Sequence, residues 1–254
     1  MMARDLARAL DPVVFARDCG IEPDPWQAEL LRSVMAVVTL LRALLLCSRQ
    51  SGKSTVTALL ALWVALFEAP ALVVIVSPSQ RQSAEMLRTI MRFHSKLDGA
   101  PALEGESALK VEFANGSRIL ALPGTEKTIR GIAGAALVII DEAARVDDEL
   151  LAAVRPMLAV AEGGGRLIAL TTPAGKRGWF FEAWTKPGDW TRVRVAATDC
   201  PRISQEFLDE ELKELGAMRF SEEYELEFRD SDEAVFPHAV IAAAFSAEVL
   251  PLWT

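Results

Sequence analysis

A short run between two apolar segments contains the residue types that hold phosphate groups. The sequence LLLCSRQSGKST places Gly52-Lys53-Ser54-Thr55 after a strand-like segment and before a helix-like one. A turn of this kind presents backbone N–H groups to phosphate oxygens, its lysine reaches the β- and γ-phosphates, and its serine hydroxyl binds Mg²⁺. The usual pattern begins with glycine where Cys47 stands here, and the turn contains Arg49, Gln50 and Ser51. The run predicts a deviant nucleotide phosphate loop, with Lys53 on phosphate and Ser54 on Mg²⁺.

A second apolar segment ends in two carboxylates. The run ALVII at 136–140 is followed by Asp141 and Glu142. At the carboxyl edge of a parallel sheet such a pair suits Mg²⁺-dependent phosphoryl transfer. We predict that Asp141 holds Mg²⁺ through its water shell and that Glu142 orients and deprotonates the attacking water. A solvated pair at a strand end is the alternative, and the phosphate loop upstream weighs against it.

The elements that must position these residues alternate between short apolar strands and amphipathic helices. This is the pattern of a mostly parallel sheet flanked by helices, so the predicted fold is α/β, of the P-loop NTPase (RecA/ASCE-like) type. Predicted strands span 43–47, 72–76, 136–140, 166–171 and 190–196. Predicted helices span about 53–67, 79–97, 147–158 and 179–184, and three shorter ones precede the first strand. The third of these begins at Asp24-Pro25, with aspartate as N-cap and proline at the first helical position.

Two further segments carry their own signals. Residues 110–122 predict a hairpin, because apolar residues flank Asn115-Gly116, a pair that favours a two-residue type I′ turn. Farther on, Ser204 caps a helix that Gly216 ends. Aromatic residues then recur at a spacing of four, at Phe220, Tyr224 and Phe228. We therefore divide the chain into a core with N-terminal helices at 1–197, a small helical lid subdomain at 198–233 and a linker at 234–254.

Composition and charge exclude several classes of protein. Apolar residues make up 51% and charged residues 24% of the 254, as in ordinary globular proteins, which excludes a disordered chain. The uncharged stretch between Lys53 and Glu68 is too short to cross a bilayer, and we predict no membrane partner. The odd number of cysteines (three) indicates reduced thiols, and the sequence contains no zinc-binding motif. The formal net charge of −8 excludes a uniformly basic nucleic-acid surface but not a local basic patch.

Four stretches resemble, in this order, the ATPase domain of the large terminase subunit, the motor that drives DNA into the procapsids of tailed bacteriophages. They are CSRQSGKST, FANGSRILALPGTEKTIRGIAGAALVIIDEAARV, LIALTTPAGKRGWFFEAW and CPRISQEFLDEELKELGAMRFSEEYELEF. The resemblance runs from about residue 24 to 240. It implies ATP and Mg²⁺ as cofactors, double-stranded DNA as partner, a homo-oligomeric ring on a capsid portal, a possible small terminase subunit, and the host cell cytoplasm as location. Such subunits normally continue into an RNase-H-like nuclease domain. We therefore predict no nuclease activity for these residues.

The resemblance also implies roles for single residues. Thr171 and Thr172 precede Pro173 as in the family's coupling motif, in which a hydroxyl senses the γ-phosphate and passes its loss to the lid. A turn after a buried strand is the alternative. Gln27 matches a glutamine that reads adenine through its amide. Asp24 and Gln27 also have the spacing of a capping box, which would occupy the same amide.

Arginines complete the predicted site. Arg130 matches the position from which this family presents an arginine finger to a neighbouring subunit, and Arg49 is the competing candidate that would act within its own chain. Such a guanidinium accelerates phosphoryl transfer roughly 10³- to 10⁵-fold in other enzymes. A surface ion pair is the alternative for Arg130. For DNA phosphates the candidates are Arg88 and Arg92, four apart on one helix face, and Arg118 beside the hairpin turn, although a solvated helix face explains them equally well.

Two other functions stay open at this point. Asp141-Glu142-Ala143-Ala144 resembles the DExx box of helicases, but too few residues follow the sheet for a second RecA-like domain. The other alternative is a module that senses nucleotide with little turnover. Glu142 argues against that module, because a pure binder needs no water-activating carboxylate.

Overall fold

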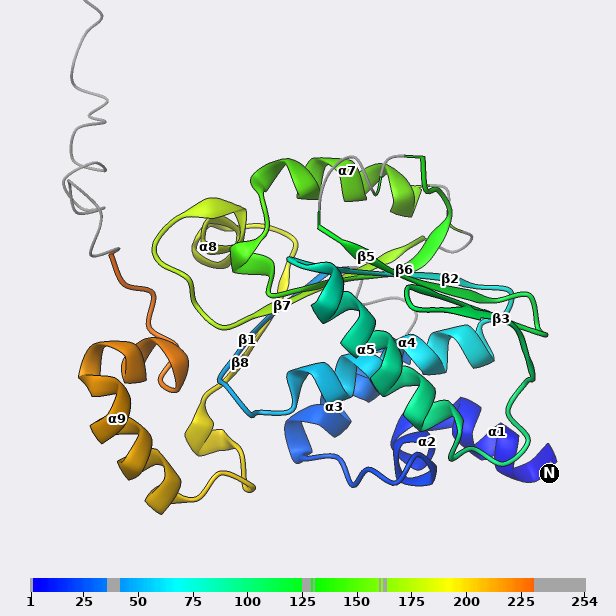
Figure 1. The fold of residues 1–254 in the computed structure, drawn as a ribbon, viewed down its shortest axis with the longest axis horizontal. Coiled ribbons are helices and arrows are strands. Elements are labelled where there is room, and N and C mark those ends of the chain that lie inside the picture. Colours follow the sequence, from blue (N-terminus) through cyan, green and yellow to red (C-terminus); the bar gives the residue numbers. More distant parts are fainter. Residues whose placement is uncertain are drawn as a thin grey trace, which may run out of the picture.

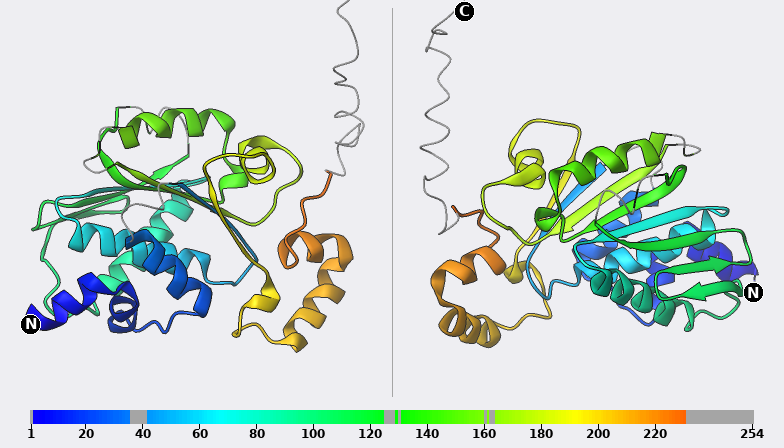
Figure 2. Two further views of the ribbon diagram at one scale, coloured as in Figure 1. Left: turned by 180° about the vertical axis from the view of Figure 1, so that it is seen from behind. Right: turned by 45° about the horizontal axis from the view of Figure 1, so that its top comes forward.

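A twisted sheet with helices on both faces forms the body of the molecule, as Figures 1 and 2 show. The computed structural model describes residues 2–35, 42–124, 129, 131–159, 161 and 164–230. The strands are β1 Arg42–Cys47, β2 Leu72–Ser77, β3 Leu103–Ser107, β4 Lys110–Phe113, β5 Arg118–Pro123, β6 Ala135–Asp141, β7 Arg166–Thr171 and β8 Thr191–Val195. In the described part of the chain they form one eight-stranded sheet in the order β3-β4-β5-β2-β6-β7-β1-β8. The pairs from β5 to β8 are parallel, and β3 and β4 extend the sheet as antiparallel strands.

Helices cover both faces of the sheet. They are α1 Met2–Leu10, α2 Pro12–Asp18, α3 Pro25–Met35, α4 Lys53–Phe67, α5 Gln80–His94, α7 Asp148–Ala159, α8 Gly178–Thr185 and α9 Gln205–Glu223, with short 3₁₀ turns η1 Ala143–Arg145 and η2 Ala197–Asp199. Helices α1 to α5 lie against one face and α7 and α8 against the other, whereas α9 stands apart from both layers (Figures 1 and 2). The predicted α/β fold is confirmed.

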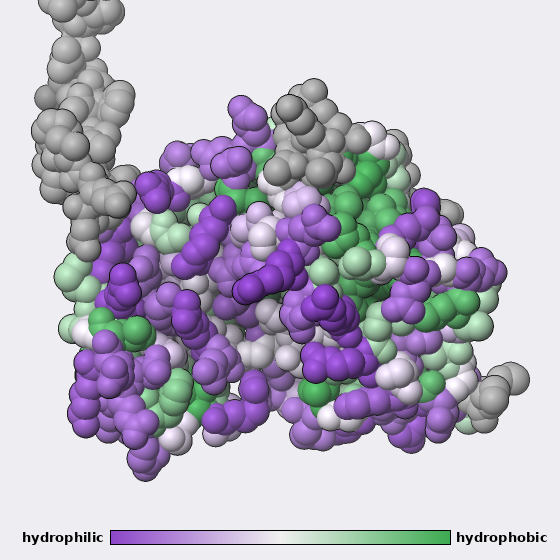
Figure 3. All heavy atoms as spheres, in the orientation of Figure 1, coloured by the Kyte–Doolittle hydropathy of each residue, from purple (hydrophilic) through white to green (hydrophobic). Residues whose placement is uncertain are grey.

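The hydrophobic core lies in two layers, one on each face of the sheet. Phe15, Leu59 and Ile90 belong to the layer under α1 to α5, and Ile140 and Phe180 belong to the layer under α7 and α8. The central strands are buried on both faces and therefore read as continuous apolar runs. Figure 3 shows that the face seen there is mostly hydrophilic, with hydrophobic side chains gathered where the sheet and its helices meet.

Helix α4 explains the long uncharged stretch in the sequence. Every residue from Val56 to Ala65 is buried, because the helix lies between the sheet and the helices α2, α3 and α5. A helix with apolar residues all round is typical of such an interior position. The phosphate loop therefore leads directly into one of the best-packed elements of the fold.

The predicted hairpin is present, but the predicted type I′ turn is wrong. A type I′ turn needs a positive φ at both central residues, and within this turn only Gly116 has one, at 83°. The N–H of Gly116 donates to the carbonyl of Phe113 at 2.9 Å, as in a longer loop that ends in a left-handed glycine. The reason lies outside the turn: the Nδ2 of Asn115 donates to the carbonyl of Ala65 at 2.9 Å and so ties the loop to the end of α4.

The C-terminal helical segment follows the prediction up to its last aromatic residue. Ser204 caps α9 by accepting from the N–H of Phe207 at 3.2 Å, and Gly216 breaks the helix with φ 74° and ψ 160°. Phe228 does not continue the apolar face of this segment, because the chain leaves the helix after Glu223. It packs instead against Phe181 of α8, with ring centroids 5.1 Å apart.

The division into core, lid and linker stays a prediction. A small hydrophobic cluster of Ala197, Leu208 and Tyr224 sits under α9, separate from the two layers of the sheet. The proposed linker at 234–254 lies outside the described residues.

Gly165, which precedes β7, allows the close approach of three backbones. A Cβ atom built there would lie 2.5 Å from the carbonyl oxygen of Ala135 and 2.9 Å from the Cα of Leu158, and neither backbone atom has room to retreat. We expect Gly165→Ala to lower the free energy of unfolding by about 1–3 kcal/mol, as overpacking does. The measurement is urea unfolding followed by circular dichroism.

Gly188→Ala is the matched control, because the nearest atom to its Cβ would be the Cδ1 of Trp190 at an ordinary 3.6 Å. We expect this variant to unfold at the wild-type urea concentration or slightly above it. Equal unfolding midpoints for the two alanine variants would contradict the steric argument.

Candidate active site

The register of three central strands brings the predicted site residues together. β7 lies between β1 and β6, with Leu46 opposite Thr171 and Leu170 opposite Asp141. The three strands are parallel, so the phosphate loop after β1, the threonines at the end of β7 and the acids at the end of β6 meet at one edge of the sheet. This is the edge at which ligands bind in open α/β sheets.

Hydrogen bonds fix the phosphate loop to the end of β8 and also within itself. The N–H of Ser48 donates to the carbonyl of Val195 at 2.9 Å, and the Oγ of the buried Ser51 donates to the carbonyl of Ser48 at 2.8 Å. Gln50 and Gly52 have φ of 57° and 88°. The left-handed backbone favours glycine at position 52, and a Cβ there would also displace the Nε2 of Gln27, which would lie 2.6 Å away.

Cys47 replaces the first glycine of the usual loop without disturbing it. It is the last residue of β1, its side chain is fully buried, and burial raises the pKa of its thiol to about 12. At neutral pH it is therefore an uncharged core residue. The substitution removes no backbone N–H from the loop.

The lysine and the two acids lie within reach of one another. The Nζ of Lys53 is 3.7 Å from the Oε1 of Glu142, and both side chains are largely shielded from solvent. Asp141 is 7% exposed and accepts the N–H of Glu142 at 3.0 Å. Burial, and next the charge of Glu142, raise the pKa of Asp141 to about 6, while Lys53 acts in the opposite direction.

These residues fit a bound Mg²⁺. Asp141 is a buried carboxylate whose charge is only partly compensated, which is the environment that a divalent cation would neutralise. Ser54 is exposed at the first turn of α4, and Thr55 beside it is half-buried. Hydroxyl and carboxylate oxygens are the ligands that Mg²⁺ prefers.

Arg145 joins the acids to the threonines, a link that the sequence analysis missed. Its Nη1 donates to the Oε2 of Glu142 at 2.8 Å and to the Oγ1 of Thr172 at 3.0 Å. The signal was present in the spacing, because Glu142 and Arg145 are three apart on the turn η1 and so face each other. Thr171 is buried one residue earlier and accepts the N–H of Ala144 at 3.3 Å.

Gln27 makes the capping contact that was one of its two predicted roles. Its Oε1 accepts the N–H of Asp24 at 2.9 Å, and its Nε2 donates to the carbonyl of Gly52 at 3.3 Å. The amide therefore lies against the phosphate loop as well as at the start of α3. Its role toward adenine stays a prediction.

Arg202 is a second residue that the sequence analysis missed. Its guanidinium makes three hydrogen bonds to the carboxylate of Asp24, the shortest of 2.7 Å, and donates to the carbonyl of Ser51 at 2.8 Å. Arg202 lies 178 residues from Asp24, so no local pattern could have revealed the pair. It ties the start of α3, the phosphate loop and the segment before α9 to one another.

The phosphate loop and the segment after β7 both contact the C-terminal helical part. Arg49 donates through its side chain to the Oε2 of Glu223 at 2.9 Å and through its N–H to the carbonyl of Glu223 at 3.1 Å. The N–H of Gly175 donates to the Oε1 of Glu222 at 3.2 Å. Arg130, the other finger candidate, lies outside the described residues.

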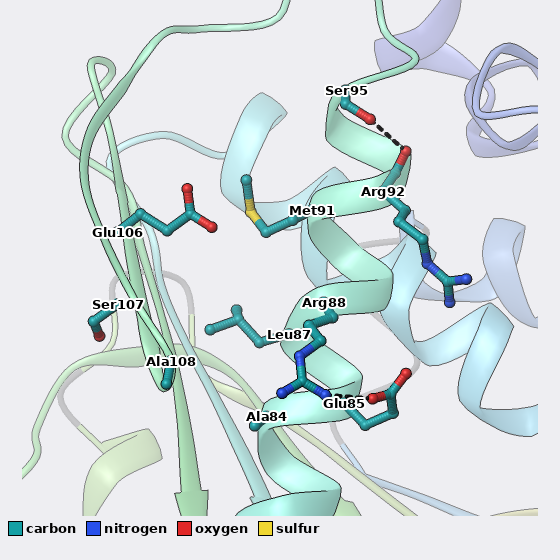
Figure 4. A pocket seen from close by; sticks show the side chains of 10 residues that line it. All are labelled: Ala84, Glu85, Leu87, Arg88, Met91, Arg92, Ser95, Glu106, Ser107 and Ala108. Carbon is teal, nitrogen blue, oxygen red and sulfur yellow. Dashed lines mark hydrogen bonds and ion pairs between the residues drawn. The ribbon is translucent and has the colours of Figure 1, made fainter.

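The predicted DNA contacts lie away from this site, and two of them line a groove. Arg88 and Arg92 border a hollow of about 850 Å³ between α5 and the end of β3 (Figure 4). Arg88 pairs with Glu85 at 2.8 Å, and in Figure 4 Arg92 points away from the hairpin while Met91 points toward it. Arg118 is exposed at the start of β5 and does not line the groove. Contact with DNA stays a prediction for all three.

Two features that would indicate other kinds of site are absent from the described residues. None of the helices there combines the length and hydrophobicity of a membrane span. No group of three or more His, Cys, Asp or Glu side chains in the same residues could hold a metal ion.

Comparison with known proteins identifies one family and several similar folds. The family described as terminase large subunit, T4-like virus type, N-terminal, matches residues 44–242. The fold is similar to the large terminase ATPase domain of Thermus phage P74-26, with a TM-score of 0.68 and 21% identity over 84% of this chain and 96% of that one. No curated protein matches the sequence.

Two longer proteins share the fold. The large terminase of bacteriophage HK97 has a TM-score of 0.66 and 18% identity, with 82% of this chain and 51% of that one covered. The large terminase of a thermophilic bacteriophage, solved in complex with ADP, has a TM-score of 0.66 and 12% identity, with 82% and 54% covered. The chain spans about half the length of these two proteins.

The raised pKa of Asp141 predicts how stability depends on pH in the absence of metal. An unfolded aspartate has a pKa of about 3.9, so the folded state binds this proton more tightly, and ionisation weakens folding as pH rises from about 4 to 6. We expect Asp141→Asn in EDTA to raise the free energy of unfolding at pH 7.5 by up to about 3 kcal/mol, with no gain at pH 4. Denaturant unfolding at both pH values measures this.

Asp189→Asn is the control, because Asp189 is exposed in the loop before β8. It should leave the free energy of unfolding unchanged at both pH values. An equal gain for Asp141→Asn at pH 4 and pH 7.5 would show that the effect does not come from the ionisation of Asp141.

Proposed function

The chain belongs to the terminase large-subunit family, and we propose that it hydrolyses ATP with Mg²⁺ to drive double-stranded DNA into a viral procapsid. The observation that carries the proposal is the 3.7 Å approach of Lys53 to Glu142 beside the buried Asp141. A site for binding alone would not need a second carboxylate at this point. The family match favours this function over a helicase, and Glu142 favours it over a nucleotide-sensing module.

The residues of the loop would hold the nucleotide. The backbone N–H groups from Gln50 to Thr55 would face the phosphates at the start of α4, and Lys53 would turn to the β- and γ-phosphates. Ser54 and Asp141 would hold Mg²⁺, which supplies charge neutralisation at the phosphates when bound. Support for the nucleotide comes from the related terminase that was solved in complex with ADP.

Glu142 would act as the general base. It lies between Lys53 and Arg145, with its Oε1 3.7 Å from the Nζ of Lys53 and its Oε2 2.8 Å from the Nη1 of Arg145, and a carboxylate held in this way can accept a proton from water. When Lys53 turns to the phosphates, Arg145 remains as the partner that orients Glu142. In hydrolysis the oxygen of this water bonds to the γ-phosphorus, the bond to the bridging oxygen breaks, and the proton of the water passes to Glu142.

The contacts around the site offer two routes from the nucleotide to the lid. One is the pair of Arg49 with Glu223, which connects the phosphate loop to the end of α9. The other runs from Thr172 along the segment after β7 to Gly175, whose N–H contacts the side chain of Glu222 on α9. Loss of the γ-phosphate would release both Arg49 and Thr172 to change partners, and the lid would move with them.

The proposal extends to partners that the family implies. We propose a homo-oligomeric ring on a capsid portal, with the small terminase subunit as a further partner, acting inside the infected host cell. In such a ring Arg130 would complete the site of the neighbouring subunit. Arg88, Arg92 and Arg118 remain the candidates for contact with DNA phosphates.

The trans-acting finger predicts that activity depends on assembly. We expect the ATP hydrolysis rate per subunit of the wild-type chain to rise with protein concentration, and Arg130→Ala and Glu142→Ala each to lose at least about 10²-fold in rate. An equimolar mixture of the two variants should recover part of the rate, because one supplies the finger and the other the intact acid. A steady-state phosphate-release assay measures this.

Lys53→Ala mixed with Glu142→Ala is the control, since neither variant then has an intact site and no recovery is expected. A rate independent of concentration, without recovery on mixing, would assign the finger to Arg49. The absence of hydrolysis by the wild-type chain under all conditions would refute the proposed activity itself.

Base recognition by Gln27 predicts a change in nucleotide preference. We expect Gln27→Ala to lower the ratio of kcat/KM for ATP over GTP by at least about tenfold, because the amide that pairs with adenine is lost. If Gln27 serves only as the cap of α3, the variant would lose about 1 kcal/mol in stability with an unchanged ratio. Measuring both quantities separates the two roles.

A further inference from the structure

A hollow rich in arginine lies between the segment after β7 and the helical lid. Its volume is about 490 Å³, and its charged lining consists of Arg145, Arg177, Arg219, Glu222, Arg229 and Asp230. Four of these six side chains are cations, in a chain whose formal net charge is −8. A local excess of positive charge on an acidic protein favours an anionic ligand.

Part of this charge is not compensated within the described residues. Arg229 pairs with Glu227 at 2.8 Å, and Asp230 pairs with Lys176 at 3.2 Å. Arg177 and Arg219 have no polar partner in that part of the chain, and the Nε of Arg229 is buried there without an acceptor. The hollow therefore offers donors from both of its sides, because Arg177 precedes α8 and Arg219 lies on α9.

The hollow is connected directly to the catalytic acid. Arg145 lines it, and the same guanidinium donates to the Oε2 of Glu142 at 2.8 Å and to the Oγ1 of Thr172 at 3.0 Å. Ala174 and Gly175, which follow the coupling threonines, form part of the same wall. The guanidinium of Arg145 thus reaches from Glu142 to the hollow.

We propose that this hollow binds the inorganic phosphate released by hydrolysis, before the phosphate leaves the protein. The inference rests on the proposed ATPase function, because that reaction supplies the phosphate beside Glu142. Hydrogen phosphate carries oxygens that accept charge-assisted hydrogen bonds from guanidinium groups. A bound phosphate would bridge Arg177 and Arg219, so the lid would stay close to the segment after β7 until the phosphate departs.

The test is the binding of inorganic phosphate to the full chain while a non-hydrolysable ATP analogue and Mg²⁺ fill the phosphate loop. With the loop occupied, ³¹P NMR titration reports binding elsewhere and also shows the resonances of the bound analogue. We expect saturable binding of phosphate to the wild-type chain, and Arg177→Gln with Arg219→Gln to weaken it about tenfold or more. The affinity for the analogue should not change in this double variant.

Arg155→Gln is the matched control, because Arg155 is exposed on α7 near the start of β1 and β7, remote from the hollow. It should bind phosphate like the wild-type chain. Equal phosphate affinity of the double variant and the wild-type chain, or binding of phosphate only when the loop is empty, would overturn the proposal. Failure of the analogue itself to bind would instead refute the proposed ATPase function.

A second arm of the experiment separates free phosphate from the phosphates of DNA. A short duplex, added to saturation, should leave the affinity for inorganic phosphate unchanged if the hollow takes the released ion. Competition between duplex and phosphate would identify the DNA backbone as the occupant and overturn the assignment to released phosphate.

Discussion

The parallel hydrogen-bonded ladder of β1, β7 and β6 is the constraint on which the site depends. Its register places Leu46 beside Thr171 and Leu170 beside Asp141. The phosphate loop, the threonines and the acids therefore follow their strands at the same edge of the sheet. A slip of one residue in any of these strands would exchange its two faces and remove its contribution to the site. The apolar runs that bury the strands on both faces therefore also fix the positions of the polar groups after them.

Beyond the ladder, several side chains of the site each contact two or more others, so the site is a network and not a set of separate pairs. Glu142 has a cation on either side, and one of these, Arg145, also holds a threonine from the neighbouring strand. The phosphate loop is likewise held by residues from α3, from β8 and from the segment before α9. In the proposed function, a change at the nucleotide would therefore alter contacts in several elements at once, including those of Arg49 and Gly175 with the end of α9.

Much of the fold was predictable because its signals are local. The strands around Lys53 and Asp141 are continuous apolar runs, and helix α4 begins and ends at the predicted residues. β3 escaped prediction because it is short, mostly exposed and lacks apolar alternation. The turn type at Asn115 was wrong because a distant carbonyl, that of Ala65, decides where the asparagine side chain lies.

The same distinction applies to the site. Each predicted group of site residues (the loop, the acids and the threonines) is a short run at the end of one strand, where a local pattern can reveal it. The structure brings the three runs together. Arg202 and Glu223 join the site through contacts with residues more than 150 positions away, which no local pattern encodes. Arg145 lay within reach of pattern analysis, because its spacing from Glu142 is that of a helical pair.

The backbone of Glu142 carries a consequence for how such a protein can evolve. This residue adopts a left-handed conformation, with φ 50° and ψ 44°, which costs a residue with a side chain about 1 kcal/mol or more. Glycine would remove this strain but would also remove the carboxylate. If Glu142 is the general base that we propose, glycine at this position would gain stability at the expense of the reaction, so the backbone strain is the counterpart of the proposed chemistry.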